Sequence, residues 1–257
     1  MKHGSLFSGI GGFDLAAEWM GWENVFHCEN NKFGQKILKY YWPNAISYGD
    51  IIETDFTIYR GNINILTGGF PCQPYSQAGK RGGDNDERHL WPEMLRAIRE
   101  IQSEWIVGEN VPGLINWNRG LVFDKIQADL EASGYKVIPF ILPAVGINAP
   151  HKRERLWIIA HSDSNRLEGR MYSEKPKKPK QLSTTLPSWY IGKEWHNNIP
   201  KSAVFSRNDD VSFKLDGITV SKWRLESIKS YGNAIVPGIA LQIFKAIEEY
   251  KLKTDKS

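Results

Sequence analysis

Short apolar runs rich in β-branched and aromatic residues alternate with longer, more polar segments up to about residue 160. The apolar runs predict strands at residues 3–7, 24–28, 63–67, 105–108, 136–142 and 156–160. The segments between them predict helices at residues 13–20, 32–41, 91–101 and 121–132. Because such alternation is typical of a parallel sheet flanked by helices, the pattern predicts an α/β fold.

The pattern changes after Ala160. Residues 162–225 contain few amphipathic repeats, isolated aromatic residues and the basic run KPKKPK, which fits either phosphate contacts or a solvated loop. From Asn233 onward, apolar residues recur at helical spacing and predict a closing helix. We therefore expect a discontinuous main domain, residues 1–161 and 226–257, interrupted by a small irregular domain at residues 162–225.

Composition narrows the class of protein only slightly. The net charge of +4 is compatible with binding nucleic acid but does not establish it. No apolar run reaches the roughly 20 residues that cross a bilayer. The two cysteines, Cys28 and Cys72, are too few for a sulfur-rich zinc site or a secreted disulfide framework. We expect a cytoplasmic protein with no membrane contact and no metal.

A glycine loop separates the first predicted strand from the first helix. Gly9, Gly11 and Gly12 allow the backbone to turn sharply and approach a ligand, although a plain tight turn has the same composition. Glu29 ends the second strand, near the spacing at which a carboxylate meets ribose hydroxyls, and Asp50 follows the second helix. Taken singly, each acid also fits a solvated surface carboxylate. Because the loop lacks a phosphate-binding lysine and the full GxGxxG pattern, it favours an adenosine cofactor without phosphates.

The stretch ILTGGFPCQPYSQAG carries the most specific chemistry. After the strand at residues 63–67, two glycines and two prolines exclude both helix and regular strand. Cys72 is therefore expected on a rigid turn at the carboxyl edge of the sheet, as a thiolate nucleophile. A structural cysteine normally packs inside an apolar element, and this is what we expect of Cys28.

Five motifs together resemble one family. GFPCQPYS, at residues 69–76, resembles the catalytic loop of the C5-cytosine-specific DNA methyltransferases. Four further motifs follow the family's order and cover the chain from residue 3 to about residue 250, except the insert: FSGIGGF at 7–13, ENV at 109–111, KRERLWII at 152–159 and GNAIVP at 232–237. The resemblance implies a Rossmann-like S-adenosylmethionine-dependent methyltransferase sheet, with residues 162–225 as a small target-recognition domain.

The resemblance also implies a mechanism. Cys72 would add to C6 of cytosine, and Glu109 would donate a proton at N3, so that C5 can take the methyl group. Arg153 and Arg155, alternating on one strand and so sharing one face, would steady the flipped base and the catalytic loop. The alternatives from the residues alone are a structural acid for Glu109 and an exposed pair for the arginines.

The cofactor and the DNA would each have their own residues. For S-adenosylmethionine, the resemblance implies Phe7 beside the adenine, Gly9, Gly11 and Gly12 near the methionine, Glu29 at the ribose, Asp50 and Ile51 at the adenine edge, and Leu90 and Asn233 completing the pocket. For double-stranded DNA we expect contacts from Gln73, Ser76, Lys80 and Arg81, the last two because their positive charge favours phosphate. The target cytosine must leave the duplex to be reached. We expect a monomer, encoded by a bacterium or phage, and the sequence leaves open whether a restriction endonuclease accompanies it.

Some residues depart from the family's pattern. His151 stands where the family often has glutamine, and Asn30 replaces an aromatic residue often found after the ribose-binding acid. The stretch before GNAIVP lacks the usual arginine-rich pattern, which leaves the small domain open. Three alternative functions remain to be weighed: a transfer RNA cytosine methyltransferase of the same fold, a DNA-binding relative without activity, and a dehydrogenase. The dehydrogenase fails because the dinucleotide fingerprint is missing, and the inactive relative is disfavoured because Cys72 and Glu109 are both present.

Overall fold

The computed structural model describes residues 1–71, 90–147, 149, 152–162 and 220–254. The chain forms two compact units, Met1–Arg170 with Asn233–Ser257, and Met171–Gly232. In the second unit the described part belongs to a single helix, α6 (Val220–Asn233). The expected small domain at residues 162–225 lies mostly outside the described residues, and its boundaries stay a prediction.

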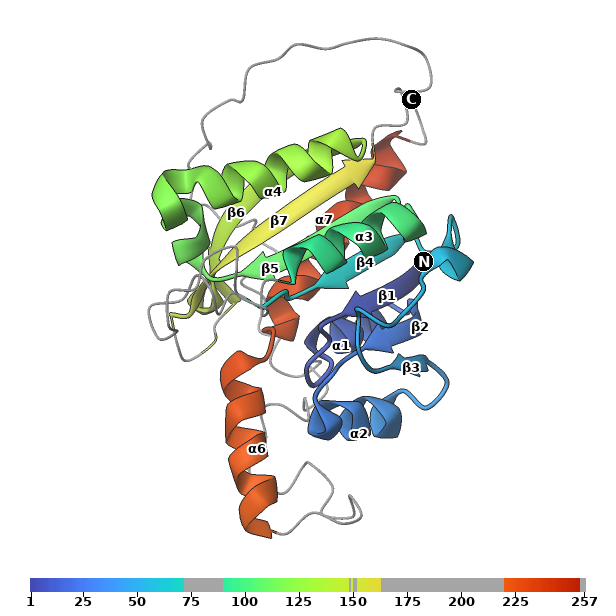
Figure 1. Cartoon of the computed structure of the whole chain (residues 1–257), viewed down its shortest axis with the longest axis vertical. Coiled ribbons are helices and arrows are strands. Elements are labelled where there is room, and N and C mark those ends of the chain that lie inside the picture. Colours follow the sequence, from blue (N-terminus) through green and yellow to red (C-terminus); the bar gives the residue numbers. More distant parts are fainter. Residues whose placement is uncertain (72–89, 148, 150–151, 163–219, 255–257) are drawn as a thin grey trace. The chain divides into compact units, whose positions relative to one another are not determined.

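The first unit is built on one seven-stranded sheet in the order β3-β2-β1-β4-β5-β7-β6. Figure 1 labels its strands and helices. The strands are β1 (Lys2–Leu6), β2 (Glu23–Cys28), β3 (Ile46–Tyr48), β4 (Ile65–Gly68), β5 (Trp105–Asn110), β6 (Tyr135–Pro143) and β7 (Glu154–Ser162). The helices are α1 (Gly12–Trp19), α2 (Lys32–Tyr41), α3 (Trp91–Ile101), α4 (Leu121–Ala132) and α7 (Pro237–Thr254), with 3₁₀ segments at Thr57–Tyr59, Pro112–Gly120 and Ala144–Ile147.

The sheet is mixed, so the expectation of a parallel sheet is wrong for one edge. Strands β3, β2, β1, β4 and β5 pair in parallel. Strand β7 runs antiparallel to both β5 and β6. The connection from β6 to β7 covers only residues 144–153, and a crossover to a parallel strand needs about a dozen residues or more. The chain therefore turns back directly and reverses the direction of β7.

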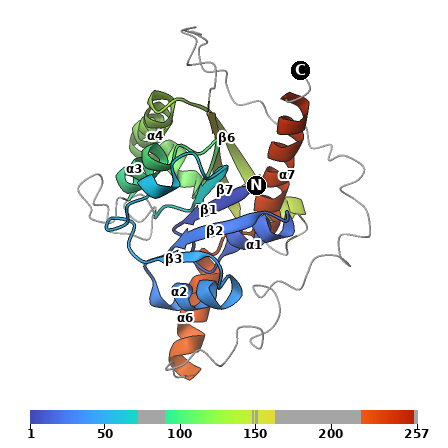
Figure 2. The same cartoon turned by 90° about the vertical axis from the view of Figure 1, so that its right-hand side faces the viewer.

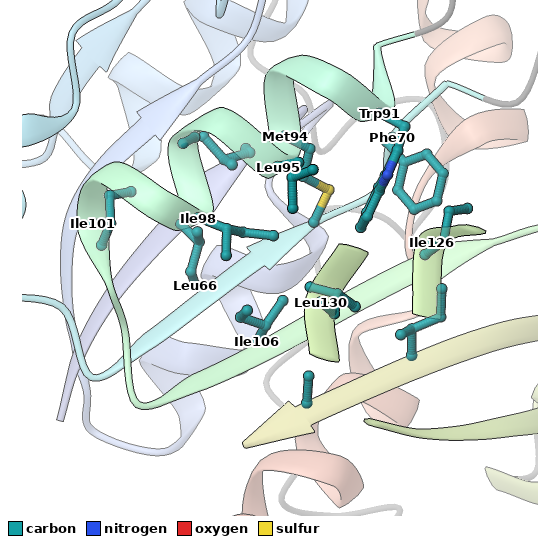
Figure 3. Close-up of a cluster of buried hydrophobic side chains, with 14 of the residues drawn as sticks. Leu66, Phe70, Trp91, Met94, Leu95, Ile98, Ile101, Ile106, Ile126 and Leu130 are labelled. Atoms are coloured by element: carbon teal, nitrogen blue, oxygen red, sulfur yellow. The ribbon is translucent and has the colours of Figure 1, made fainter. Parts of the chain in front are cut away.

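Helices cover both faces of the sheet. On one face, Leu66 and Ile106 pack against α3 and α4 in a buried cluster, part of which Figure 3 shows. On the other face, Ile65 and Val107 pack against α1 and α7. Figure 2 shows these two pairs of helices on opposite sides of the strands. Because neighbouring residues of a strand point to opposite faces, the near-continuous apolar runs of β4 and β5 supply both cores.

The predicted elements agree with the structure in most places and differ in three. Strand β3 was not expected, and α6 is helical from Val220, so residues 220–225 of the expected irregular insert belong to a regular helix. The closing helix begins at Pro237, because proline is favoured in the first helical turn, and not at Asn233. Cys28 is buried, as expected. Among the helices that the structure describes, none is long and apolar enough to span a membrane.

Candidate active site

The glycine loop leaves β1 and enters α1 through backbone angles that favour glycine. Gly9 and Gly11 have positive φ values of 57° and 85°. A Cβ atom added to Gly11 would lie 2.2 Å from the ring of Trp42, so this position also requires close packing. At Gly9 an added Cβ would meet none of the described residues within 4 Å. The loop is therefore tightly packed at Gly11 and open at Gly9, where a ligand can approach the backbone.

Glu29 is directly connected to this loop. Its Oε2 accepts a hydrogen bond from the backbone N–H of Gly9 at 2.6 Å, and its Oε1 accepts one from Asn31 N–H at 2.7 Å. Burial raises the pKa of the Glu29 carboxyl, against the lowering effect of these two bonds. Strands β1 and β2 are parallel neighbours, so the loops that follow them meet at the same edge. Gly9 and Glu29, both predicted from the sequence as cofactor residues, are thus in direct contact.

Other predicted cofactor residues lie at the ends of neighbouring elements. Asp50 comes shortly after β3, and its Oδ1 accepts a hydrogen bond from Ile52 N–H at 2.9 Å. Ile51 is buried, and its carbonyl accepts a hydrogen bond from Arg96. Leu90 is the residue before α3. Phe7 has a positive φ of 51° and is half-buried at the end of β1. These residues lie where β1, β3 and α3 reach the carboxyl edge of the sheet.

Ile235, which the sequence did not single out, contacts both predicted sites. It follows Asn233 and Ala234, and it packs so closely on the glycine loop that a Cβ added to Gly12 would lie 2.7 Å from its side chain. A Cβ added to Gly69 would lie 3.4 Å from Ile235 Cδ1. Asn233 itself is exposed. The signal for Ile235 was its place inside the GNAIVP motif.

Glu109 lies near the carboxyl end of β5, within a group of charged side chains. Its Oε1 is 3.0 Å from Nε of Arg155, and its side chain is 12% exposed. Burial raises the pKa of the Glu109 carboxyl to about 7, while the nearby charges of Arg155 and Arg153 act in the opposite direction. At neutral pH the carboxyl is therefore divided between its protonated and ionised forms, which suits a group that donates a proton.

Arg153 reaches this site differently from the sequence expectation. The expectation that Arg153 and Arg155 alternate on one strand is wrong, because β7 begins at Glu154 and Arg153 precedes it with a positive φ of 26°. Its Nη2 donates a hydrogen bond of 2.7 Å to the carbonyl of Ala234. Burial lowers the pKa of Arg153, and the charge of Glu109 raises it. Arg155 therefore acts on Glu109 from strand β7, and Arg153 acts on it from the residue before that strand.

The segment that leads to Cys72 passes beside Glu109. Strand β4 ends at Gly68, and a Cβ added to the following Gly69 would lie 3.5 Å from Glu109 Oε2. Pro71 is the last described residue before the segment 72–89. The described part shows that the chain enters this segment next to the buried acid. The expected roles of five residues stay predictions, because these lie outside the described residues: Cys72, Gln73, Ser76, Lys80 and Arg81.

Fold and site together define a class. A seven-stranded mixed sheet of this order, with a glycine loop after β1, a buried acid near the end of β5 and antiparallel β7, is a methyltransferase fold. A methyltransferase of Entamoeba histolytica, EhMeth, has a similar structure, with a TM-score of 0.64 and 18% identity over 95% of this chain and 97% of that one. A putative DNA modification methyltransferase of an Escherichia coli prophage superposes with a TM-score of 0.55 and 24% identity, over 65% of this chain and 48% of that one.

The chain belongs to the C-5 cytosine-specific DNA methylase family, whose model matches residues 1–203. The Type II methyltransferase M.PspPI of Psychrobacter is 36% identical over 200 residues, 77% of this chain and 48% of the relative. The Type II methyltransferase M.Eco47II of Escherichia coli is 34% identical over the same share of both chains. The chain thus spans about half the length of the curated relatives that it matches.

Proposed function

We propose that the chain is a DNA (cytosine-5-)-methyltransferase, which transfers a methyl group from S-adenosylmethionine to C5 of a cytosine flipped out of duplex DNA. The main support is Glu109. It is a buried carboxyl with a pKa of about 7, paired with Arg155 and adjacent to the segment that carries Cys72. Membership of the C-5 cytosine-specific DNA methylase family agrees with this chemistry.

The proposed reaction uses these groups in sequence. The Cys72 thiolate forms a bond to C6, and the electron pair of the C5–C6 double bond moves through the ring while N3 takes a proton from Glu109. When bound, S-adenosylmethionine would supply an electrophilic methyl group to C5; the bond between that methyl group and sulfur would break, leaving S-adenosylhomocysteine. A base removes the C5 proton, the C6–sulfur bond breaks, Glu109 recovers its proton, and the aromatic ring is restored.

The glycine-loop edge of the sheet suits the cofactor. Gly9 leaves space beside the backbone, and Glu29 is half-buried just after β2, with its carboxylate bonded to the loop. The loop carries no lysine to neutralise phosphates, which agrees with a cofactor of this kind. An adenosine and its methionine chain would be held by these two residues together with Asp50, Ile51, Leu90 and Asn233.

The proposed partner is duplex DNA. Gln73, Ser76, Lys80 and Arg81 would contact it, and positive charge there would bind phosphates. The curated relatives carry the name Type II methyltransferase. We extend this to the chain as a cytoplasmic, monomeric modification enzyme of a bacterium or phage, accompanied by a restriction endonuclease.

Genome-wide mapping of 5-methylcytosine tests the proposal. The protein is expressed in a strain without DNA methylation, beside a Cys72→Ser variant. Methylation at one recurrent sequence, absent with the variant, supports the function and identifies the target. Purified protein is then offered duplex DNA and transfer RNA. Methylation of transfer RNA alone would replace the DNA proposal by its closest alternative.

A further inference from the structure

Asn110 makes the contact that joins the strand of the acid to the segment of the nucleophile. The parallel ladder between β4 and β5 ends at the pair Gly68–Gly108. Two residues beyond that pair, the side-chain Nδ2 of Asn110 donates a hydrogen bond of 3.2 Å to the carbonyl of Phe70. A side chain thus continues the connection between the two segments past the end of the backbone ladder.

The amide of Asn110 is fixed at both ends. Its Oδ1 accepts a hydrogen bond of 2.8 Å from Val111 N–H, so the amide nitrogen is the atom that faces Phe70. The side chain is only 2% exposed, and water cannot readily replace either bond. The amide has one favourable orientation. Turning it over would place Oδ1 against the Phe70 carbonyl oxygen and Nδ2 against the Val111 N–H, so both hydrogen bonds would be lost.

The carbonyl that Asn110 binds belongs to a residue with a fixed ring. Phe70 is buried, and Figure 3 shows its ring beside that of Trp91. The centroids of the two rings are 5.2 Å apart. Trp91 in turn donates a hydrogen bond from Nε1 to Asp129 on α4. Phe70 is therefore positioned by its ring on one side and by its carbonyl on the other. Its backbone continues through Pro71 to Cys72.

We infer that Asn110 is a positioning residue, which sets where the Cys72 segment leaves the sheet relative to the Glu109 carboxyl. The inference rests on the proposed function. Glu109 and Asn110 are consecutive residues, so the backbone that carries the acid also carries the donor that binds the nucleophile's segment. A displacement of about 1 Å in such an arrangement can reduce a rate on the order of 10²-fold.

Substitution of the amide separates this role from a merely structural one. Asn110→Ala removes the donor, and Asn110→Asp replaces it with a carboxylate that only accepts. The readout is the rate at which a covalent adduct forms with duplex DNA carrying 5-fluorocytosine at the mapped target. We expect Asn110→Ala to slow adduct formation about 10- to 100-fold per molecule that binds S-adenosylmethionine. Affinity for S-adenosylmethionine should stay within about twofold, because the cofactor edge lies on other residues.

The Asn110→Asp variant supplies a signature that lost stability would not produce. Once the introduced carboxyl is protonated, it can again donate to the Phe70 carbonyl, and burial beside Glu109 favours protonation. The ratio of variant to wild-type rate should therefore rise as the pH falls from about 8 to about 6. The charged groups of this site, Glu109, Arg153 and Arg155, are present in both proteins, so a change in the ratio reports the introduced carboxyl.

A matched control is Asn24→Ala, at the start of β2. Asn24 also makes two side-chain hydrogen bonds, to His3 and to the Asp14 carbonyl, and its loss should reduce stability without slowing the adduct. A wild-type rate in Asn110→Ala, an equal loss of cofactor binding, or a rate ratio of Asn110→Asp that does not change with pH would each overturn the inference. If the wild-type protein itself forms no adduct, the proposed function fails instead.

Discussion

Glu109 Oε1 lies 3.0 Å from Arg155 Nε, yet the pKa of the carboxyl is about 7. Burial raises the pKa more than the arginine lowers it. A carboxyl beside a cation is usually ionised, and in this site the removal of water outweighs the ion pair. Because its pKa is near neutrality, the Glu109 carboxyl can both donate a proton and accept it again at pH 7.

Replacing the acid tests its role directly. Glu109→Gln keeps the shape and the hydrogen-bonding capacity but removes the transferable proton. General acid–base contributions are typically about 10²–10⁴-fold, and turnover should fall within that range while S-adenosylmethionine affinity changes little. Glu104→Gln, at the opposite end of β5, is the matched control and should keep its activity. A Glu109→Gln enzyme within a few-fold of wild type would remove Glu109 from the reaction.

Removing the arginine should shift the pH dependence upward. Arg155 lowers the pKa of Glu109, so Arg155→Gln should raise it. Activity that needs protonated Glu109 declines as the pH rises through that pKa, and the variant should retain its maximal rate to a higher pH. Single-turnover rates between about pH 6 and pH 9 measure this limb. Arg99→Gln, whose arginine bonds to Ser133 on the surface, should leave the limb unchanged; an unmoved limb in Arg155→Gln would contradict the coupling.

The cofactor edge is tested without DNA. Glu29→Ala and Asp50→Ala should each weaken S-adenosylmethionine binding, measured by calorimetry. A hydrogen bond to a charged group contributes about 1.5–3 kcal/mol, which corresponds to roughly 10- to 150-fold in affinity. Asp55→Ala removes an exposed carboxylate that bonds to Thr57, and should bind the cofactor normally. Unchanged affinity in both the Glu29 and Asp50 variants would show that the cofactor lies elsewhere.

Much of this fold can be predicted from the sequence, and the exceptions have physical causes. The long apolar runs and the glycine loop predict the parallel part of the sheet. Strand β3 is missed because it has only three residues, Ile46–Tyr48, two of them exposed. The direction of β7 depends on the short connection between β6 and β7. The strand propensity of the two segments does not show whether they pair in parallel or antiparallel.

Some features of the candidate site can likewise be predicted from the sequence, and others depend on the folded structure. The sequence predicts Glu29 from its spacing after the glycine loop, and it predicts Glu109 from the resemblance of ENV to the family's motif. It does not give the pKa of Glu109, which arises from burial and from two arginines far along the chain. Nor does it place Arg153, whose left-handed backbone and bond to Ala234 depend on packing of the closing segment. The position of Cys72 rests on the sequence, since it lies outside the described residues.

Asp14 should make stability depend on pH. It is fully buried at the start of α1, and burial raises its pKa from 3.8 to about 7. The folded state then holds a proton that the unfolded chain releases, so Asp14 reduces stability as the pH rises from about 4 to 7. Buried His3 has the opposite slope, because its pKa is lowered to about 4 and stability is lost as the pH falls from 6.5.

The variant Asp14→Asn isolates the carboxyl from the histidine. The difference in Tm between variant and wild type should grow in favour of the variant from about pH 5 to pH 8, by several degrees for a gain of about 1–2 kcal/mol. Thermal unfolding across that range measures it. A difference that is constant with pH would mean that Asp14 is ionised in the folded protein at both ends of the range.

The covalent step is the central claim, and trapping it is the most direct measurement. Duplex DNA with 5-fluorocytosine at the target cannot lose fluorine as a proton is lost, so the enzyme should remain attached through Cys72 after methyl transfer. Mass spectrometry of the denatured complex should find one adduct in the wild-type protein and one in the Cys28→Ser variant. Cys28 is not expected to react, because burial raises the pKa of its thiol to about 12. Cys72→Ser should give none. An adduct that persists in Cys72→Ser, or its absence from wild-type protein that methylates the same sequence, would contradict the account.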